Sequence, residues 1–201
     1  WMNRVRIVPS SQPLIPPMVD QAAQQAIYEA LLPDKQLECE YQSRISGEEK
    51  TYVLNPLALV QKGAVIYLIC TRHDKNAIQT FALHRFKAAR VLESRAMHQN
   101  DFHLDEYIES GALGFRVDYQ KATENIELKL TMNAKTVHFF EESALSRDQV
   151  IEQFTDNLYQ VRATVPFTSQ LVWWLRGFGR KILQIEPQIV ADAVYEHEVD
   201  A

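Results

Sequence analysis

The chain has 201 residues, 46% of them hydrophobic and 23% charged, which is the composition of a folded globular protein with one or two domains. Its formal net charge of −5 excludes a protein that binds nucleic acid over its whole surface, so any anion site must be a local basic patch. No apolar run approaches the roughly 18 residues that cross a membrane.

The two cysteines, Cys39 and Cys70, lie in apolar runs and belong to no CxxC or Cys/His pattern. They predict buried free thiols rather than a metal site. Because free thiols are typical of a reducing compartment and no signal peptide is visible, we expect a cytoplasmic protein. We expect no cofactor and no metal.

Residues 1–34 are expected to form a proline-rich linker and a lead-in helix. Half of the eight prolines lie in the first 18 residues, where they favour extended backbone: Pro9, Pro13, Pro16 and Pro17. Helical spacing of apolar residues follows over residues 19–32, with Asp20 as a candidate N-cap and Pro33 as the stop. The opening Trp1-Met2 indicates a fragment of a longer protein.

Residues 35–95 predict a small β-barrel. Apolar and polar residues alternate over residues 37–42, which is typical of a half-buried strand. Further strand-like runs follow at residues 51–60, with an interruption at Asn55-Pro56, and at residues 65–71, 79–83 and 88–92. A polar loop is expected at residues 72–76. Five short strands with short turns favour a barrel.

Residues 96–114 are expected to form a connecting helix over residues 101–110, and residues 115–201 a second domain. The predicted order there is strand, helix, two strands, helix, strand, helix. The predicted elements are residues 126–132, 134–142, 149–154, 158–167, a helix from Thr168 or Ser169 to Arg176, 182–185, and a last helix from Pro187 to about His197. This order is typical of a ferredoxin-like split βαβ fold, so the whole chain is expected to be α+β.

Several short motifs follow one another in the first domain. They are Tyr41 on an aromatic strand, Pro56-Leu57-Ala58-Leu59, Tyr67-Leu68 after Ile66, and Gln79-Thr80-Phe81-Ala82-Leu83-His84-Arg85. In order and spacing they resemble the WYL domain, an SH3-like or Sm-like barrel named for a Trp-Tyr-Leu strand. Ile66 replaces the family's Trp.

The last motif also departs from the family pattern. The family usually has Arg-x-Phe-x-Leu-x-Arg there, and Gln79 replaces the first arginine while Arg85 keeps the second. Tyr52 stands where the family usually has another arginine. The tail resembles the C-terminal extension that follows WYL domains, through residues 173–179 and Ile185-Glu186-Pro187.

The resemblance implies a bacterial or phage-related transcriptional regulator, some of whose relatives act beside antiphage defence systems. It implies an upstream winged helix-turn-helix that contacts DNA, and a WYL domain that senses a nucleotide or oligonucleotide effector. Because operators are commonly read by two-fold symmetric proteins, a homodimer is expected. Trp173 and Trp174 in the C-terminal domain are candidate interface residues.

A nucleotide site needs cations for phosphate and flat groups for bases. The predicted ligand-binding residues are Tyr41, Ser43, Arg44, Tyr67, Gln79, His84 and Arg85. On an unbent fourth strand, Gln79, Phe81, Leu83 and Arg85 would share one face, and Tyr41, Ser43 and Ile45 one face of the first strand.

Each candidate has an alternative role. Arg85 could make a surface salt bridge, Tyr67 could belong to the core, and Ser43 and Arg44 could be ordinary strand-end groups. Gln79 lacks the family's charge. No nucleophile-elbow, phosphate-binding or metal pattern is present, so an enzyme is not expected. The alternative function is a stand-alone module that binds single-stranded nucleic acid or a partner protein.

Overall fold

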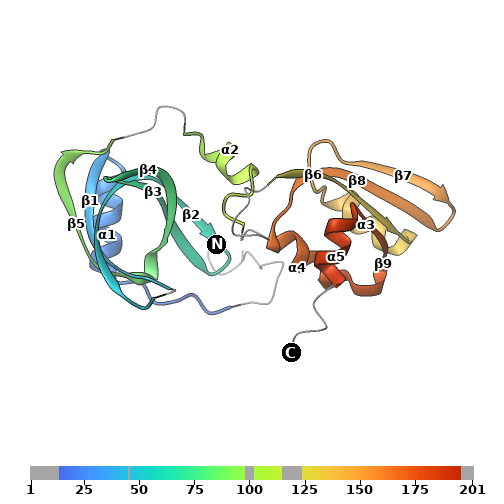
Figure 1. The fold of residues 1–201 in the computed structure, drawn as a ribbon, viewed down its shortest axis with the longest axis horizontal. Helices are drawn as coiled ribbons and strands as arrows, with labels where there is room; N and C mark the ends of the chain where they lie inside the picture. The colour runs from blue at the N-terminus through green and yellow to red at the C-terminus, as the bar shows by residue number, and fades with distance from the viewer. Residues whose placement is uncertain (1–13, 45, 98–101, 115–123, 196–201) are drawn as a thin grey trace, which may run out of the picture. The chain divides into compact units, whose positions relative to one another are not determined.

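The computed structural model describes residues 14–44, 46–97, 102–114 and 124–195. The chain divides into two compact units, Trp1–Phe102 and His103–Ala201, each with an antiparallel sheet and helices (Figure 1). The α+β prediction is confirmed. The expectations for Pro9 and Pro13, for Ile45 and for the last helix beyond Tyr195 lie outside the described residues.

Unit 1 consists of a helix and five strands. They are α1 (Gln21–Leu31), β1 (Lys35–Gln42), β2 (Glu49–Lys62), β3 (Val65–Arg72), β4 (Lys75–Ala82) and β5 (Phe86–Arg95), with the 3-10 turn η1 (Leu83–Arg85) between β4 and β5. The sheet order is β4-β3-β2-β1-β5. The pairing of the described strands leaves β4 and β5 at the edges, so closure into a barrel stays a prediction.

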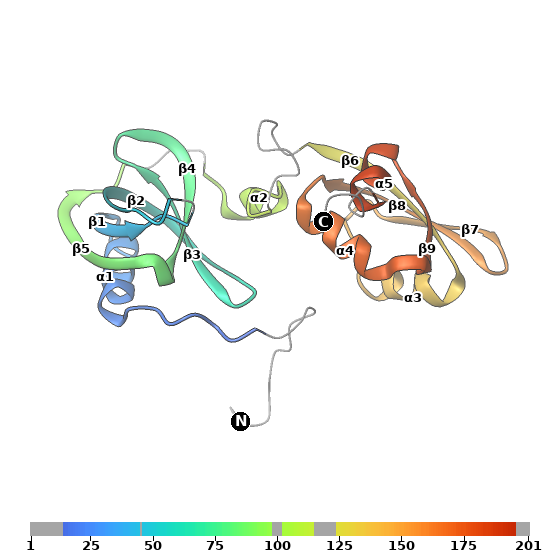
Figure 2. The same ribbon diagram turned by 60° about the horizontal axis from the view of Figure 1, so that its bottom comes forward.

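Helix α1 is part of the core of unit 1. Asp20 caps it as predicted, because its carboxylate accepts a hydrogen bond from the Ala23 amide at 2.8 Å. Its buried face packs over β1 and β5, as Figures 1 and 2 show, and contains Ala23, Ala26, Ile27 and Ala30. The sheet supplies Leu37, Leu54, Leu68 and Phe86 to this core, and the η1 turn supplies Leu83. Cys39 and Cys70 are buried free thiols here, as predicted.

The expected interruption of β2 at Asn55-Pro56 is wrong. The strand runs through both residues, with a shift of register between Pro56 and Ala58. Pro56 is tolerated because the pairing of β1 with β2 ends at Leu54, so the missing N–H of the proline breaks no bond on that side. The buried Asn55 side chain donates to Thr71 Oγ1 at 3.1 Å and accepts from the Met97 amide at 3.0 Å.

The expected loop at residues 72–76 is also wrong, because β4 begins at Lys75. Arg72 pairs with Lys75, which leaves only His73 and Asp74 in the turn. Arg72 donates from Nε to the Asp74 carboxylate at 2.9 Å and steadies this turn. The polar residues misled the prediction because they lie on an exposed part of an edge strand.

Unit 2 begins with α2 (Leu104–Glu109) and confirms the predicted order of elements. It continues with β6 (Asn125–Met132), α3 (Ala134–Glu142), β7 (Val150–Thr155), β8 (Leu158–Pro166), α4 (Ser169–Phe178), the 3-10 turn η2 (Gly179–Lys181), β9 (Ile182–Glu186) and α5 (Gln188–Tyr195). The sheet order is β7-β8-β6-β9. Of the two residues at which this helix was expected to begin, Thr168 and Ser169, Thr168 is the N-cap of α4, since its hydroxyl accepts a hydrogen bond from the Leu171 amide.

The core of unit 2 lies between the sheet and its helices. An aromatic cluster joins α3 to α4 and contains Phe139, Phe140, Trp174 and Phe178, with ring centroids 4.8–6.0 Å apart. Trp174 belongs to this packing, whereas Trp173 is 53% exposed. None of the helices in the described part of the chain is both long and apolar enough to cross a membrane.

Candidate functional site

Four of the seven predicted site residues come together where β4 turns into β5. The strand ends at Ala82, and Leu83 and Phe86 are both buried, so they anchor the two ends of the η1 turn. His84 and Arg85 lie between these anchors and are half-buried. The expected shared face of residues 79–85 is therefore wrong beyond Ala82, because the strand gives way to a 3-10 turn there.

Tyr41 supports this turn from β1. Its ring is 8% exposed and packs edge-on against Phe81 and Phe86, at centroid distances of 4.7 and 5.2 Å. Its hydroxyl oxygen accepts a hydrogen bond from the Ala82 amide at 3.1 Å. Burial raises the pKa of Tyr41, and the bond from Ala82 and the nearby Arg85 guanidinium oppose that rise. The hydroxyl therefore links the core to the site.

Tyr67 approaches the same place from β3. It pairs directly with Ala82, is half-buried, and lies near enough to Tyr41 to affect the pKa of that residue. We call the group formed by Tyr41, Tyr67, His84 and Arg85 the corner site. It combines one guanidinium, one imidazole and two phenol rings drawn from two strands, β1 and β3, and the η1 turn.

His84 has a buried ring atom with no partner. Its Nδ1 makes no hydrogen bond in the structure. Burial lowers the pKa of His84, and the positive charge of Arg85 lowers it further. An unpartnered buried polar atom is unfavourable, and an anionic acceptor at this point would satisfy it.

The remaining predicted residues lie elsewhere in unit 1. Gln79 pairs with Cys70, and Tyr67 precedes Cys70 by three positions on β3 with no register shift between them. Because side chains alternate along a strand, Gln79 and Tyr67 lie on opposite faces of the β3–β4 hairpin.

Ser43 and Arg44 lie in the turn between β1 and β2. Ser43 donates from its amide to the Glu48 carbonyl at 2.9 Å, and its hydroxyl accepts from the Ser46 amide at 3.4 Å. Arg44 is exposed in the same turn. The structure thus gives Ser43 a clear part in the turn itself.

Lys62 is a cation near the corner site that the sequence analysis missed. In the β2–β3 pair, Val60 faces Tyr67 and Lys62 faces Val65, so Lys62 lies on the same face as Tyr67, one diagonal step away. Burial lowers the pKa of Lys62, which indicates a partly desolvated ammonium. The alternation of residues along β2 indicates which face Lys62 occupies, but the pairing that brings Lys62 beside Tyr67 cannot be seen in the sequence.

Tyr52 stands where the WYL family usually has an arginine, and its ring contacts an arginine from a neighbouring strand. The guanidinium of Arg72 lies 4.9 Å from the centre of the Tyr52 ring, and that ring packs edge-on against Phe81. A cation therefore still occupies this part of the unit, supplied by β3 instead of β2. In the described part of the chain, no three His, Cys, Asp or Glu side chains gather as a metal site would require.

Fold and site together define a two-unit α+β protein whose first unit gathers cationic and aromatic side chains at one corner. Residues 22–91 match the WYL domain, and residues 124–197 match the WCX domain. The chain is therefore a WYL-domain protein in which a WCX domain follows the WYL domain. The matched WYL region begins inside α1, in agreement with the place of that helix in the core.

Two solved structures are similar to the chain. One is proteasome accessory factor B/C (PafBC) of Arthrobacter aurescens, with 18% identity, a TM-score of 0.44, and coverage of 94% of this chain and 28% of that one. The other is described as a CRISPR Cas-related protein, with 15% identity, a TM-score of 0.47, and coverage of 87% and 48%. The chain spans less than half the length of either. No curated protein matches it.

Proposed function

We propose that this chain is the effector-sensing and dimerising region of a WYL-type transcriptional regulator, and that the corner site binds a nucleotide or short nucleic acid. The observation that carries the proposal is that Arg85 and His84, whose buried Nδ1 has no hydrogen-bond partner, lie beside two tyrosines. The WYL match places this site in a domain class associated with ligand-sensing regulators.

The chemistry of the corner suits a phosphate with an attached base. The Arg85 guanidinium can donate two parallel hydrogen bonds to phosphate oxygens. His84 Nδ1, once protonated, can donate another, and the half-buried Tyr67 ring offers a surface for stacking. Lys62 adds a second positive charge on the Tyr67 face. On a chain with a net charge of −5, this local gathering of cations directs an anion to one place.

The same contacts offer a route from ligand to protein. Arg85 interacts with the Tyr41 hydroxyl, which also accepts the Ala82 amide hydrogen. A phosphate that engages Arg85 competes with Tyr41 for the guanidinium and so changes a contact of the core. We propose that this favours one of two arrangements of a homodimer and alters operator binding by a DNA-binding domain elsewhere in the regulator. One or two charge-assisted hydrogen bonds, at about 1.5–3 kcal/mol each, suffice for such coupling.

We also propose a specific fold for each of the two units. For unit 1 we propose an SH3-like or Sm-like barrel, supported by five antiparallel strands of which the two edge strands are consecutive in sequence. For unit 2 we propose a ferredoxin-like sandwich, supported by the strand order β7-β8-β6-β9 and the helices α3 and α4 that connect its strands.

The test is the binding of short fluorescently labelled oligonucleotides, followed by anisotropy at two salt concentrations. We expect Arg85→Ala to weaken binding by about tenfold or more, because it removes at least one charge-assisted hydrogen bond. Arg95→Ala is the matched control, since Arg95 is an exposed arginine at the end of β5. Equal loss in both variants, or none in Arg85→Ala, contradicts the assignment of the corner site.

The length of the bound strand separates the proposed sensor from the alternative accessory module. A sensor saturates with short oligonucleotides, whereas a module for single strands binds long strands more tightly and with a steeper dependence on salt. We further propose that the chain binds its ligand without converting it. A turnover assay with cyclic and linear oligonucleotides checks this, and any product formed in proportion to protein contradicts it.

A further inference from the structure

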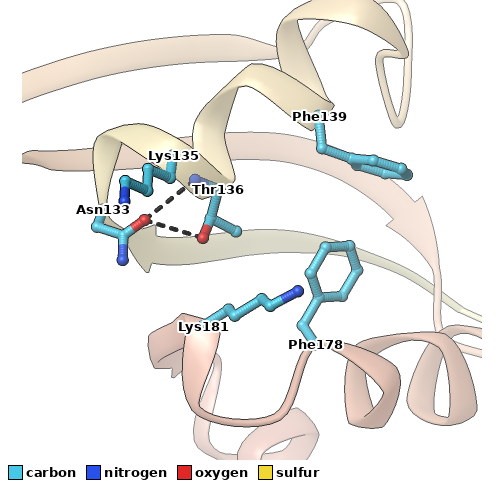
Figure 3. A pocket seen from close by; sticks show the side chains of 6 residues that line it. All are labelled: Asn133, Lys135, Thr136, Phe139, Phe178 and Lys181. Atoms are coloured by element: carbon cyan, nitrogen blue, oxygen red, sulfur yellow. Dashed lines mark hydrogen bonds between the residues drawn. The ribbon is translucent and has the colours of Figure 1, made fainter.

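Unit 2 contains a pocket that is separate from the corner site. It has a volume of about 480 Å³ and lies between the start of α3 and the end of α4 with η2 (Figure 3). Its lining residues are Asn133, Lys135, Thr136, Phe139, Phe178 and Lys181. A volume of this size holds a small organic molecule.

The polar groups of the pocket are donors and cations. Lys135 comes from α3 and Lys181 from η2, and Figure 3 shows the Lys181 ammonium beside the Phe178 ring and the Lys135 side chain beside Asn133. The Asn133 side-chain oxygen accepts from the Thr136 amide and hydroxyl, both at 3.0 Å, so the amide nitrogen points the other way as a donor. None of the six lining residues is acidic. The pocket is therefore electrostatically suited to an anion.

The start of helix α3 does not itself supply the anion site. Its first amides are already used, because Asn133 accepts from the Thr136 amide and the Asn157 side chain accepts from the Ala134 amide at 3.3 Å. The two lysine side chains remain as the groups that can neutralise a bound negative charge.

The walls of the pocket are aromatic. Phe139 and Phe178 meet edge-to-face, with centroids 5.4 Å apart and an interplanar angle of 76°. Phe139 is 47% exposed although it belongs to the aromatic cluster of this unit. A flat ring placed against it would cover apolar surface that now faces solvent.

From the two lysines and the two phenylalanines we infer that this pocket binds a small aromatic anion, with the ring on Phe139 and the anionic group between Lys135 and Lys181. The shared chemistry is a planar ring that carries a carboxylate or a phosphate. An aryl carboxylate and a nucleoside monophosphate are the two sources of such a ligand.

Ligand-observed saturation-transfer NMR with the full chain tests this inference. The probes are benzoate and AMP, each compared with a half-probe: cyclohexanecarboxylate, which keeps the anion, and adenosine, which keeps the ring. All titrations are made in an Arg85→Ala background, which weakens binding at the corner site, so that a loss in the lysine variant reports on the pocket of unit 2. The variants are the double Lys135→Gln/Lys181→Gln and, separately, Phe139→Leu.

We expect benzoate, AMP or both to bind, and the double lysine variant to weaken that binding by about tenfold or more. Phe139→Leu weakens the aromatic probe more than cyclohexanecarboxylate. Arg180→Gln is the matched control, because Arg180 carries the same charge on η2 but does not line the pocket. Circular dichroism confirms that each variant is folded.

The outcomes show whether the pocket binds an aromatic anion and whether that anion is a carboxylate or a phosphate. Binding of benzoate alone assigns a carboxylate ligand, and binding of AMP alone assigns a phosphate ligand. The inference is overturned when neither probe binds, when adenosine binds as well as AMP, or when the double lysine variant binds as tightly as Arg180→Gln.

Discussion

Tyr41 serves the core and the corner site at once. Its ring fills space between Phe81 and Phe86, and its hydroxyl accepts the Ala82 amide hydrogen where β4 ends. Because Arg85 interacts with the same hydroxyl, the position of the guanidinium depends on a buried side chain. The residues of the proposed site and the residues of the core are therefore joined through one oxygen atom.

Replacing Tyr41 by Phe isolates this oxygen. The ring packing is kept, but the Ala82 amide loses its acceptor, so we expect the free energy of unfolding to fall by about 1–3 kcal/mol. Urea unfolding followed by circular dichroism measures the change. Tyr195→Phe is the control, since Tyr195 is 58% exposed in unit 2. Equal effects in the two variants would show that the hydroxyl bond contributes nothing specific.

His84 gives the proposed binding a dependence on pH. In the free protein, burial and the charge of Arg85 lower the pKa of His84 and so favour the neutral ring. A bound phosphate diester favours the protonated ring and raises that pKa, so binding takes up a proton. Affinity therefore increases as pH falls through the interval between the two pKa values.

The measurement is the affinity for one oligonucleotide at about pH 5.5 and about pH 7.5, which bracket the ordinary histidine pKa. We expect tighter binding at the lower pH in the parent protein and a much smaller difference in His84→Gln. A phosphodiester probe is suitable because it does not titrate in this interval. An unchanged pH profile in His84→Gln would assign the protonation to another group.

At the scale of elements, the sequence predicted the features that depend on neighbouring residues alone, such as helix caps and the bounds of individual helices and strands. Asp20 was expected as a cap, and the start of α4 was expected at Thr168 or Ser169. Asp20 and Thr168 each accept an amide hydrogen of their helix. The strand at β6 and the helix α3 lie within a residue of their expected bounds. The errors at β2 and β4 arose because an edge position or a missing neighbour lets a strand contain proline or polar residues.

The grouping of the candidate residues was predicted in part, and their binding of a ligand stays a prediction. Arg85, His84, Tyr67 and Tyr41 were found because they stand in recognisable motifs and the η1 turn brings two of them beside the others. Gln79 lies on the other face from Tyr67 because the register between strands fixes the face, and the sequence does not show register.

Lys62 was missed for a related reason. Its place beside Tyr67 depends on the pairing of β2 with β3, and in the sequence it stands only as part of a Lys-Gly turn. The pairing of strands thus decides which polar residues become neighbours in the fold.

The packing of helix α1 against the sheet contributes to the stability of unit 1. Ile27 is fully buried against the sheet, and its truncation in Ile27→Ala leaves a cavity. We expect the free energy of unfolding of unit 1 to fall by about 2–5 kcal/mol. Leu32→Ala is the matched control because Leu32, next to the same helix, is 84% exposed. Thermal unfolding measures both, and a Tm loss of similar size in the two variants would contradict the place of α1 in the core.

At the scale of the molecule, the two units have separate cores and separate candidate sites. The corner site belongs to the WYL domain, and the lysine-lined pocket belongs to the WCX domain. A chain with a net charge of −5 repels anions on average, so both sites depend on a few local cations. If the two proposed sites bind anions, we therefore expect single substitutions of those cations to weaken binding strongly while leaving each core intact.

The proposed homodimer is the last property that belongs to the whole molecule. Trp173 on α4 is 53% exposed, and Ile189 on α5 is 58% exposed. The two helices are joined because Arg176 donates from Nε to the Val194 carbonyl at 3.0 Å. Exposed aromatic and aliphatic side chains on adjoining helices are typical of a protein interface.

We expect the 23.2 kDa chain to sediment as a dimer, at twice the mass of one chain. The variant Trp173→Glu is expected to be a monomer, because burying a carboxylate in an apolar interface is strongly unfavourable. Sedimentation equilibrium over a range of concentrations measures the change. Leu32→Glu is the control, since it places the same charge on an 84% exposed residue of unit 1 and leaves the dimer intact. A dimer that survives Trp173→Glu would move the interface away from α4, and a monomeric parent chain would remove dimerisation from the proposed function.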